Sequence, residues 1–288
     1  MTARPTLRDE GLFGPGSMTW KVHGHPAMLV GGMRALIIQS LDPLAMAGVA
    51  QHSDYRTRGI YRLRRTIRYV LTVTYGDRRA AHRAGEIVRA VHERIHGVDP
   101  ITGRRYTAED PDTLLWVHCV EVHSFAAAYR AFGGSLSDDE RDRYFAESVQ
   151  SAALVGIDAE RVPKNGREMR AYFESKRPTL CLSHAALDAI RFVASPPLYR
   201  VRLPVWLSLR LASAAAIGLL PRYVRELTGL ERGRLADAAA YATTGAALLP
   251  LALALEMPFA ERANVARLRR FAAAHPFGPG ERPAVAVA

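Results

Sequence analysis

The sequence predicts an all-α fold, a single globular helical domain, from three observations. Apolar residues recur at helical spacing through most of the chain, as they do from Met28 to Ser40. Strand-like alternation is scarce. Residues that start and stop helices stand where these apolar patterns begin and end. We expect one domain over residues 13–277, with loose termini at 1–12 and 278–288.

The first predicted helices are bounded by clear start and stop residues. Asp42-Pro43 marks the start of a small-residue helix over 44–51. Gly76 ends a second helix over 61–75, and Gly97 ends a third over 79–95. The turn-rich segment 98–111 is expected to be a loop.

Helices in the rest of the chain are predicted from the same kinds of start and stop residues. Asp110-Pro111 opens a helix over 112–132, which Gly133-Gly134 closes. Ser137 and Glu140 have the spacing of a capping box and begin the next helix. The last predictions are short helices over 165–174 and 183–192, a break at 196–197, apolar helices over 206–219 and 235–255, and a turn over 222–226.

Composition excludes several classes of protein. The chain has 288 residues, about half of them hydrophobic, with 39 Lys and Arg against 28 Asp and Glu, and a formal charge of +11. Because the arginines are scattered and no zinc-finger or RNA-binding signature is present, we expect no nucleic-acid partner. Two cysteines, Cys119 and Cys181, make neither a disulfide scaffold nor a cysteine zinc site and suit a reducing cytosol.

Two segments bear on membranes and targeting. Met1 to Ser17 lacks the apolar core of a secretion signal, so a cytoplasmic protein is expected. Residues 238–255 carry no charge over almost the length of a membrane span, but they are rich in Ala, Thr and Gly and contain Pro250. We interpret them as a buried helix of a large core.

The first candidate site is Arg62 with Thr66, which stand four residues apart on one predicted helix and share a face. That face offers a cation and a hydroxyl together. The competing interpretation is a solvated run of arginines, Arg62, Arg64 and Arg65, with Arg62 held in an ion pair. The spacing alone favours the competing interpretation.

The second candidate is His92 with Glu93 and His96, near the end of a predicted helix. A neutral imidazole in an apolar setting is a good iron ligand, and one proximal histidine suffices for haem. Glu93-x-x-His96 is also half of a di-iron pattern, but the second half is missing because His118 and Glu121 come in the reverse order. One core and one surface histidine remain the alternative, with His96 next to the helix end.

The third candidate is His118 with Glu121 in an otherwise apolar helix. Buried polar side chains need partners, so these two either satisfy neighbouring groups or line a pocket. Cys119 between them lacks a basic neighbour one turn away that would make it a nucleophile. No Gly-x-Ser-x-Gly motif, phosphate-binding loop or dinucleotide fingerprint is present, which removes the common hydrolase and nucleotide-binding classes.

Taken in order, these segments resemble the superfamily that contains the latex-clearing rubber oxygenases and the MpaB-type oxygenases, and most closely its short bacterial members. The resemblance runs from about residue 13 to residue 255. It rests on Phe13 to Ser17, Gly31-Gly32 to Gln39, His52-Ser53, Arg62 to Thr66, His92, Trp116 to His118, Gly97 to Pro100, Tyr106 to Pro111 and Leu220 to Arg222.

The resemblance implies a haem pocket between helices, with a b-type haem whose iron is held by a histidine. Carried over by position, the proximal metal ligand is His92, and the Arg-x-x-x-Thr pattern of the pocket is Arg62 with Thr66. Arg65 and His118 join the expected cofactor-binding set. The resemblance thus favours the functional interpretation of the first two candidates.

Two departures from the rubber oxygenases matter. Where those enzymes have a lysine before the threonine, this chain has Arg65, a far poorer iron ligand because it stays protonated. Their upstream acid-base carboxylate has no glutamate counterpart here, only Asp42 and Asp54. His52 is the proposed substitute for proton transfer, with a helix-end hydrogen bond as its alternative role.

We therefore expect a haem b-dependent oxygenase or oxidase that acts on a small or medium hydrophobic substrate with dioxygen. The catalytic set is Arg62, Thr66 and His52. One alternative is a non-catalytic helical protein that binds haem or lipid and contacts a membrane peripherally through its arginines and apolar C-terminal helices. Another is a non-haem metal enzyme that uses His92, Glu93, His96 and His118.

Overall fold

Helices account for nearly all the regular structure in the computed structural model, which describes residues 11–195, 202–231 and 233–254 together with 269, 272–274 and 277. The only strands in the described residues form one short hairpin. The predicted all-α class is therefore confirmed.

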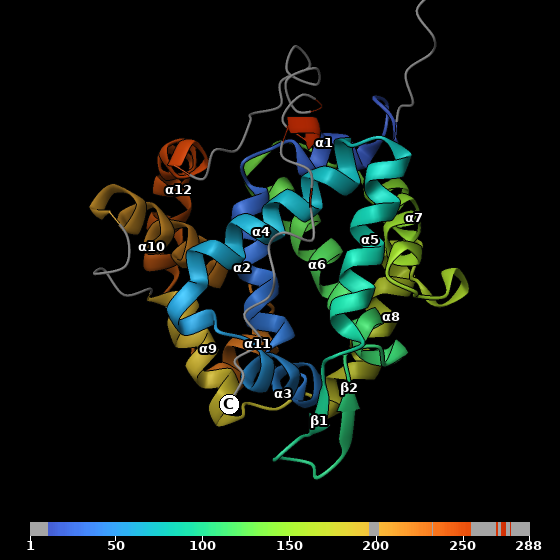
Figure 1. Ribbon diagram of the computed structural model, residues 1–288. Coiled ribbons are helices and arrows are strands. Elements are labelled where there is room, and N and C mark those ends of the chain that lie inside the picture. The colour runs from blue at the N-terminus through green and yellow to red at the C-terminus, as the bar shows by residue number, and fades with distance from the viewer. Residues whose placement is uncertain are drawn as a thin grey trace, which may run out of the picture.

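The elements follow one another in the order shown in Figure 1. They are α1 Met18–His23, α2 Met28–Gln39, α3 Pro43–His52, α4 Tyr55–Tyr75, α5 Arg78–His92, β1 His96–Val98, β2 Arg105–Thr107, α6 Pro111–Phe132, α7 Asp138–Leu154, η1 Ala159–Arg161, α8 Gly166–Lys176, η2 Arg177–Thr179, α9 His184–Ala194, α10 Leu203–Gly218, α11 Arg222–Thr228 and α12 Arg234–Ala254.

Helices α2 and α6 pack against each other in the middle of the molecule (Figure 1). Gly31 makes this close approach possible, because a Cβ atom there would lie 2.7 Å from Phe125 Cδ1 and 3.0 Å from the Ser124 carbonyl oxygen. On one side of this pair lie α10 and α12, and on the other lie α5 and α7 (Figure 1). Because α6 is central, its different faces contact different neighbouring helices.

Side-chain caps explain where several helices begin. The carboxylates of Asp42, Asp77 and Asp110 accept backbone N–H groups of the first turns of α3, α5 and α6. Ser137 and Glu140 make both bonds of the predicted capping box at the start of α7. These polar signals were readable in the sequence, and the corresponding helix starts agree with the prediction to within one residue for α5, α6 and α7.

The predicted end of the third helix was wrong. Helix α5 ends at His92, and residues 96–98 form strand β1, which pairs with β2 so that His96 faces Thr107. The backbone N–H of Ala108 also bonds the Ile95 carbonyl oxygen. The segment predicted as a loop therefore contains a hairpin, and His92 and His96 do not share a helix.

Other boundaries differ because short helices carry little periodic signal. Helix α1 has 6 residues and was not predicted, and α11 has 7 residues where a turn was expected. Helix α4 begins at Tyr55 rather than at residue 61, with a non-helical residue, Arg58, near its start. The kink at Arg58 separates the added turn from the predicted helix.

The main core forms between α1, α2, α4, α6 and α7. Trp20 stacks near Tyr75 with a ring separation of 5.3 Å, and its indole N–H donates to the Thr74 carbonyl oxygen. The Cys119 side chain is fully buried in this core, whereas that of Cys181 is partly exposed. Leu12 was expected to lie in a loose terminus, but it is buried in a smaller cluster that includes Phe277. The predicted break at 196–197 and the termini 1–10 and 278–288 lie outside the described residues.

Among the described residues, no single helix has both the length and the apolar character to cross a bilayer, although the bent pair α10 and α11 meets both criteria when taken together. The apolar segment 238–255 falls mostly in α12, where Thr244 and Leu248 are buried. Tyr241 and Leu235 of the same helix are exposed. The expectation of a buried helix is therefore met by one side of α12 only.

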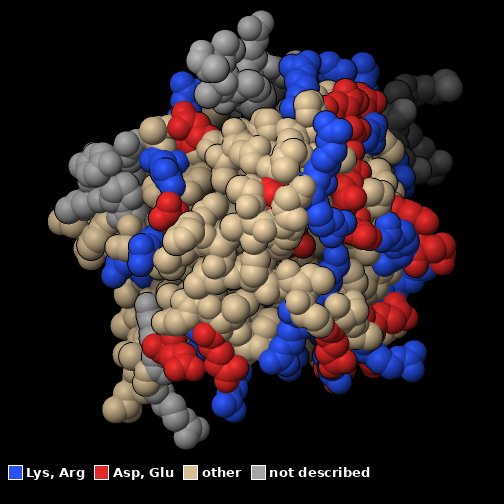
Figure 2. All heavy atoms as spheres, turned by 90° about the horizontal axis from the view of Figure 1, so that it is seen from below, with Lys and Arg blue, Asp and Glu red and all other residues tan. Residues whose placement is uncertain are grey.

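Figure 2 shows the face of the molecule seen from below, where basic and acidic side chains alternate at the margins around a largely uncharged centre. Several arginines are held by carboxylates, as in Arg56 with Asp188 at 2.6 Å and Arg225 with Asp237 at 2.6 Å. On this face the cationic excess is distributed and not concentrated in one basic surface.

Candidate functional site

Arg62 and Thr66 lie on α4, four residues apart as the sequence predicted. The Arg62 side chain is half-buried, and neither a hydrogen bond nor an ion pair joins it to another described residue. Burial and the neighbouring Arg65 lower the pKa of Arg62, while Tyr55 raises it. The Thr66 side chain is exposed. The interpretation of Arg62 as an ion-paired surface residue is therefore wrong for the described part of the chain.

His92 is the last residue of α5, which packs against α4. Its Nδ1 atom is buried and has no hydrogen-bond partner in the described residues. Burial lowers the pKa of His92, so the imidazole is neutral at physiological pH and keeps a lone pair on one ring nitrogen. A buried imidazole nitrogen without a hydrogen-bond partner has the chemistry of a metal ligand.

His52 is placed away from the α4 pair. It ends α3, and its Nε2 atom lies 3.1 Å from the carbonyl oxygen of His96 on β1. Its ring also lies edge-on to Tyr106, at 6.4 Å between centroids. This is the helix-end hydrogen bond that the sequence left open as the alternative role. Asp42 is occupied too, because it caps α3 through the Ala45 N–H.

His118 lies on α6 with Nε2 3.3 Å from Ser148 Oγ of α7. Ser148 donates its own proton to the Phe145 carbonyl oxygen at 2.7 Å, so its hydroxyl accepts from His118. Burial lowers the pKa of His118 to about 4. The ring is therefore neutral, protonated on Nε2, and Nδ1 has a free lone pair.

Glu121 was noted in the sequence but not included among the predicted site residues. It lies one turn beyond His118 on α6, is partly accessible, and has no hydrogen bond to the described residues. Burial raises the pKa of Glu121 to about 7. Tyr69 of α4 and Tyr144 of α7 are close enough for the Glu121 charge to raise their pKa values, although burial is the larger cause. The signal in the sequence was a glutamate in an apolar helix.

The remaining predicted residue, Arg65, contacts a residue near the C-terminal end of the sequence. Its guanidinium lies over the Phe277 ring at 5.1 Å from the centroid. Across the described residues, no group of three or more His, Cys, Asp or Glu side chains gathers in a metal-binding arrangement. The separation of His92 from His96 removes the helical His pair on which a non-haem metal site was hypothesised.

A family model for "ER-bound oxygenase mpaB/B'/Rubber oxygenase, catalytic domain" matches residues 20–249, which is most of the chain. The chain belongs to this family. The matched span contains α4, α5 and α6 and all the predicted site residues. Membership of an oxygenase family supports an enzyme, and the resemblance to the superfamily is confirmed.

A solved structure of latex clearing protein in the closed state is similar in fold, with a TM-score of 0.57 and 14% sequence identity. The match covers 94% of this chain and 76% of the other. At this identity the likeness bears on the fold alone. A search of curated protein sequences finds no match.

Proposed function

We propose that this chain is a haem b-dependent oxygenase that acts on a small or medium hydrophobic molecule with dioxygen. The observation that carries the proposal is the buried, partnerless Nδ1 of a neutral His92, within a chain of the mpaB and rubber oxygenase family. When bound, haem would supply the redox chemistry that activates dioxygen. The chain's own residues would bind the cofactor, orient the reactants and hold protons.

His92 is the proposed proximal ligand, because iron binds the neutral form of imidazole and burial keeps this ring neutral. Arg62 is the proposed partner of an anionic group of the cofactor, such as a propionate. Its guanidinium stays charged and is not held by a carboxylate in the described residues. Thr66 would add a hydroxyl on the same face of α4.

We propose a different residue for proton transfer from the one predicted from the sequence, Glu121 in place of His52. His52 is bound at a helix end, whereas Glu121 has a pKa of about 7 and can both hold and release a proton near neutral pH. His118, one turn away, offers a neutral ring with a free Nδ1 lone pair. We propose Glu121, supported by His118, as the acid-base group of the oxygenase.

Arg65 is not proposed as an iron ligand. Its position over the Phe277 ring, and the persistent charge of a guanidinium, both argue against that role. Arg65 would therefore not take the role of the lysine that the resemblance to the rubber oxygenases implies, and the substrate class is proposed only as hydrophobic.

The deciding experiment compares two histidine variants. Protein expressed with haem precursor should purify with a Soret band and about one haem b per chain by pyridine extraction. His92→Ala should lose most of this haem. His96→Ala is the matched control, because His96 lies exposed on β1, and it should keep the haem.

A colourless wild-type protein that is fully folded by circular dichroism would contradict the haem proposal. Loss of haem in the His96 variant, with retention in the His92 variant, would contradict the proposed ligand. Circular dichroism of both variants separates cofactor loss from unfolding.

A further inference from the structure

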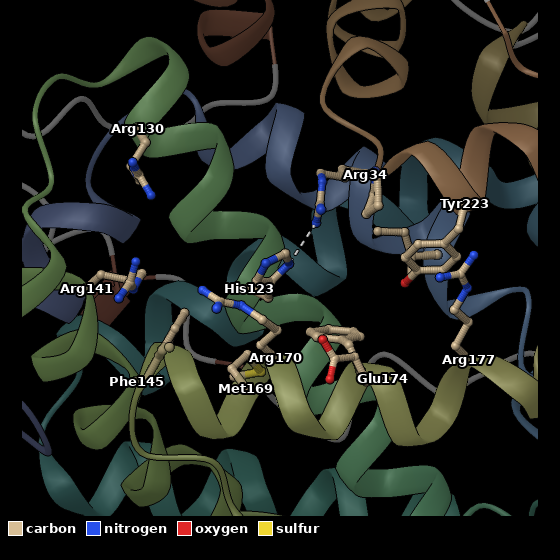
Figure 3. A pocket seen from close by; sticks show the side chains of 14 residues that line it. Arg34, His123, Arg130, Arg141, Phe145, Met169, Arg170, Glu174, Arg177 and Tyr223 are labelled. Carbon is tan, nitrogen blue, oxygen red and sulfur yellow. Dashed lines mark hydrogen bonds between the residues drawn. The ribbon is translucent and has the colours of Figure 1, made fainter.

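An arginine-lined pocket lies against the face of α6 that carries His123, which differs from the face that carries His118 and Glu121. It has a volume of about 440 Å³ and is lined by residues of α2, α6, α7, α8, η2 and α11 (Figure 3). Five arginines line it, namely Arg34, Arg130, Arg141, Arg170 and Arg177. Glu174 is the only carboxylate among its described lining residues. The lining therefore carries a strong excess of positive charge.

The two sites are separated by the geometry of α6. His118 and His123 are five residues apart, which rotates their side chains by about 140° about the helix axis. His118 contacts Ser148, whereas His123 contacts Arg34 of α2 and lies 4.9 Å from the Phe173 ring of α8. The arginine-lined pocket is therefore distinct from the proposed haem site.

Arg34 is a buried cation that lacks an anion. Its side chain is 2% exposed, and its guanidinium donates to three neutral acceptors. These are the Leu219 carbonyl oxygen at 2.9 Å, Ser124 Oγ at 2.7 Å and His123 Nδ1 at 3.3 Å. Burial lowers the pKa of Arg34 to about 10, so the group is still charged at neutral pH. Buried charges are normally paired, but no carboxylate among the described residues forms an ion pair with Arg34.

His123 is oriented to help bind such a group. Burial, followed by Arg34 and Arg141, lowers the pKa of His123 to about 3, so the ring is neutral. Its Nδ1 accepts from Arg34, which leaves the ring proton on Nε2. The Nε2–H is a donor with no acceptor among the described residues, and it belongs to a side chain that lines the pocket.

The other arginines differ in how far they are already satisfied. Arg141 is held by Asp138 at 2.6 Å and Asp142 at 3.0 Å. The guanidinium of Arg177 lies over the Tyr223 ring, 4.9 Å from its centroid. Figure 3 shows these two residues side by side at one end of the pocket. Arg130 and Arg170 have no carboxylate partner in the described part of the chain. Arg177 likewise has no carboxylate partner among the described residues, so three exposed arginines are available in addition to buried Arg34.

The rest of the pocket wall is apolar, with contributions from Ile38, Phe145, Met169 and Phe173. A free inorganic ion would leave this wall in contact with water. An amphiphilic ligand would cover it and gain from the apolar area removed from solvent.

We propose that this pocket binds an organic oxyanion, a carboxylate or phosphate monoester with an attached apolar group. Its head group is bound by Arg170, Arg177 and the Arg34–His123 pair, and its apolar part lies against Phe145, Met169 and Phe173. The proposal does not depend on the haem site, because none of the residues that line this pocket is among those proposed to bind haem or to transfer protons.

Titration calorimetry on the full-length protein tests the ligand class with four probes. Octanoate and octyl phosphate carry both features, octan-1-ol has only the apolar part, and inorganic phosphate has only the charge. Each amphiphilic anion should bind at least about tenfold more tightly than octan-1-ol, since charge-assisted hydrogen bonds to arginine exceed neutral ones. They should also bind more tightly than inorganic phosphate.

A pair of double variants tests the location. Arg170→Ala with Arg177→Ala should weaken binding of the preferred anion about tenfold or more, because both side chains line the pocket. Arg143→Ala with Arg167→Ala removes the same charge from exposed positions outside the pocket and should leave binding within about twofold of wild type.

Three results would overturn the proposal. They are equal affinity for octan-1-ol and the anions, no binding of either amphiphilic anion at millimolar concentration, and unchanged affinity in the Arg170 and Arg177 double variant. Equal affinity for inorganic phosphate would overturn the assignment of an apolar part. Both substituted arginines in the pocket variant are exposed, so folding is not expected to depend on them, and thermal unfolding verifies this.

Discussion

At the scale of single residues, Glu121 is the group whose charge changes nearest neutral pH. Burial raises its pKa to about 7 in the folded chain, from 4.5 in the unfolded chain. Between these pH values the folded protein holds a proton that the unfolded protein has released. The contribution of Glu121 to the free energy of unfolding therefore decreases as the pH rises from 4.5 to about 7.

Glu121→Gln should remove this pH dependence, because glutamine cannot ionise. Relative to wild type, the variant should be more stable to urea at about pH 8 than at about pH 5. Glu147→Gln on the neighbouring helix α7 is a suitable comparison. The Glu147 carboxylate accepts hydrogen bonds from the backbone N–H and the hydroxyl of Thr19, so this substitution should destabilise the protein. The same difference from wild type at both pH values would contradict a raised pKa at Glu121.

The residues of the site were predictable to different degrees. Arg62, Thr66 and His92 were identified because their pattern resembles a known superfamily, and His118 because a polar residue in an apolar helix needs an explanation. Arg34 stands in an equally apolar helix but was not singled out. Its partners, Ser124 and Leu219, are 90 and 185 residues away, so no local pattern reveals their contact.

At the scale of elements, the close packing of α2 on α6 can be tested at two adjacent glycines. Gly31→Ala places a Cβ 2.7 Å from Phe125 and 3.0 Å from backbone atoms of α6, and should cost about 1–3 kcal/mol of stability. Gly32→Ala meets nothing within 4 Å and should stabilise the helix by up to about 1 kcal/mol.

Chemical denaturation of the two variants measures this difference directly. The two substitutions are in the same helix, replace the same residue type and add the same methyl group. They should nevertheless change the stability in opposite directions, because only the methyl group at position 31 meets α6. Equal effects would mean that α2 and α6 are not as close as the structure has them.

Helix positions were well predicted wherever caps and periodicity agreed. Asp110-Pro111 and Gly133 bound α6 almost as expected, and Ser137 with Glu140 fixed the start of α7. The hairpin was missed because its strands have three residues each and its pairing depends on contacts across a turn. Gly97 was interpreted as a helix stop, although it lies within β1 opposite Tyr106.

At the scale of the whole molecule, three histidines in the interior, His23, His118 and His123, govern the response to acid. Burial lowers the pKa of His23 to about 3, of His118 to about 4 and of His123 to about 3, from 6.5. In the unfolded chain these rings take up protons below pH 6.5, whereas in the folded chain they stay neutral. The free energy of unfolding therefore decreases as the pH falls from 6.5 toward 4.

Thermal unfolding across this range should show a falling midpoint temperature together with net proton uptake on unfolding. His118→Gln keeps a side-chain amide for Ser148 and should reduce this acid sensitivity. His82→Gln, at an exposed position on α5, should not. Acid sensitivity that is the same in wild type and the His118 variant, and reduced in the His82 variant, would contradict the assignment.

The thiol of Cys119, next to His118 on α6, is fully buried, and burial raises its pKa to about 12. An alkylating reagent attacks the thiolate, so this sulfur is protected twice, by lack of access and by protonation. Its modification requires α6 to separate from its neighbours. The alkylation rate of Cys119 therefore measures how often α6 separates from its neighbours. A ligand that stabilises the packing of α6 would lower this rate without contacting the sulfur.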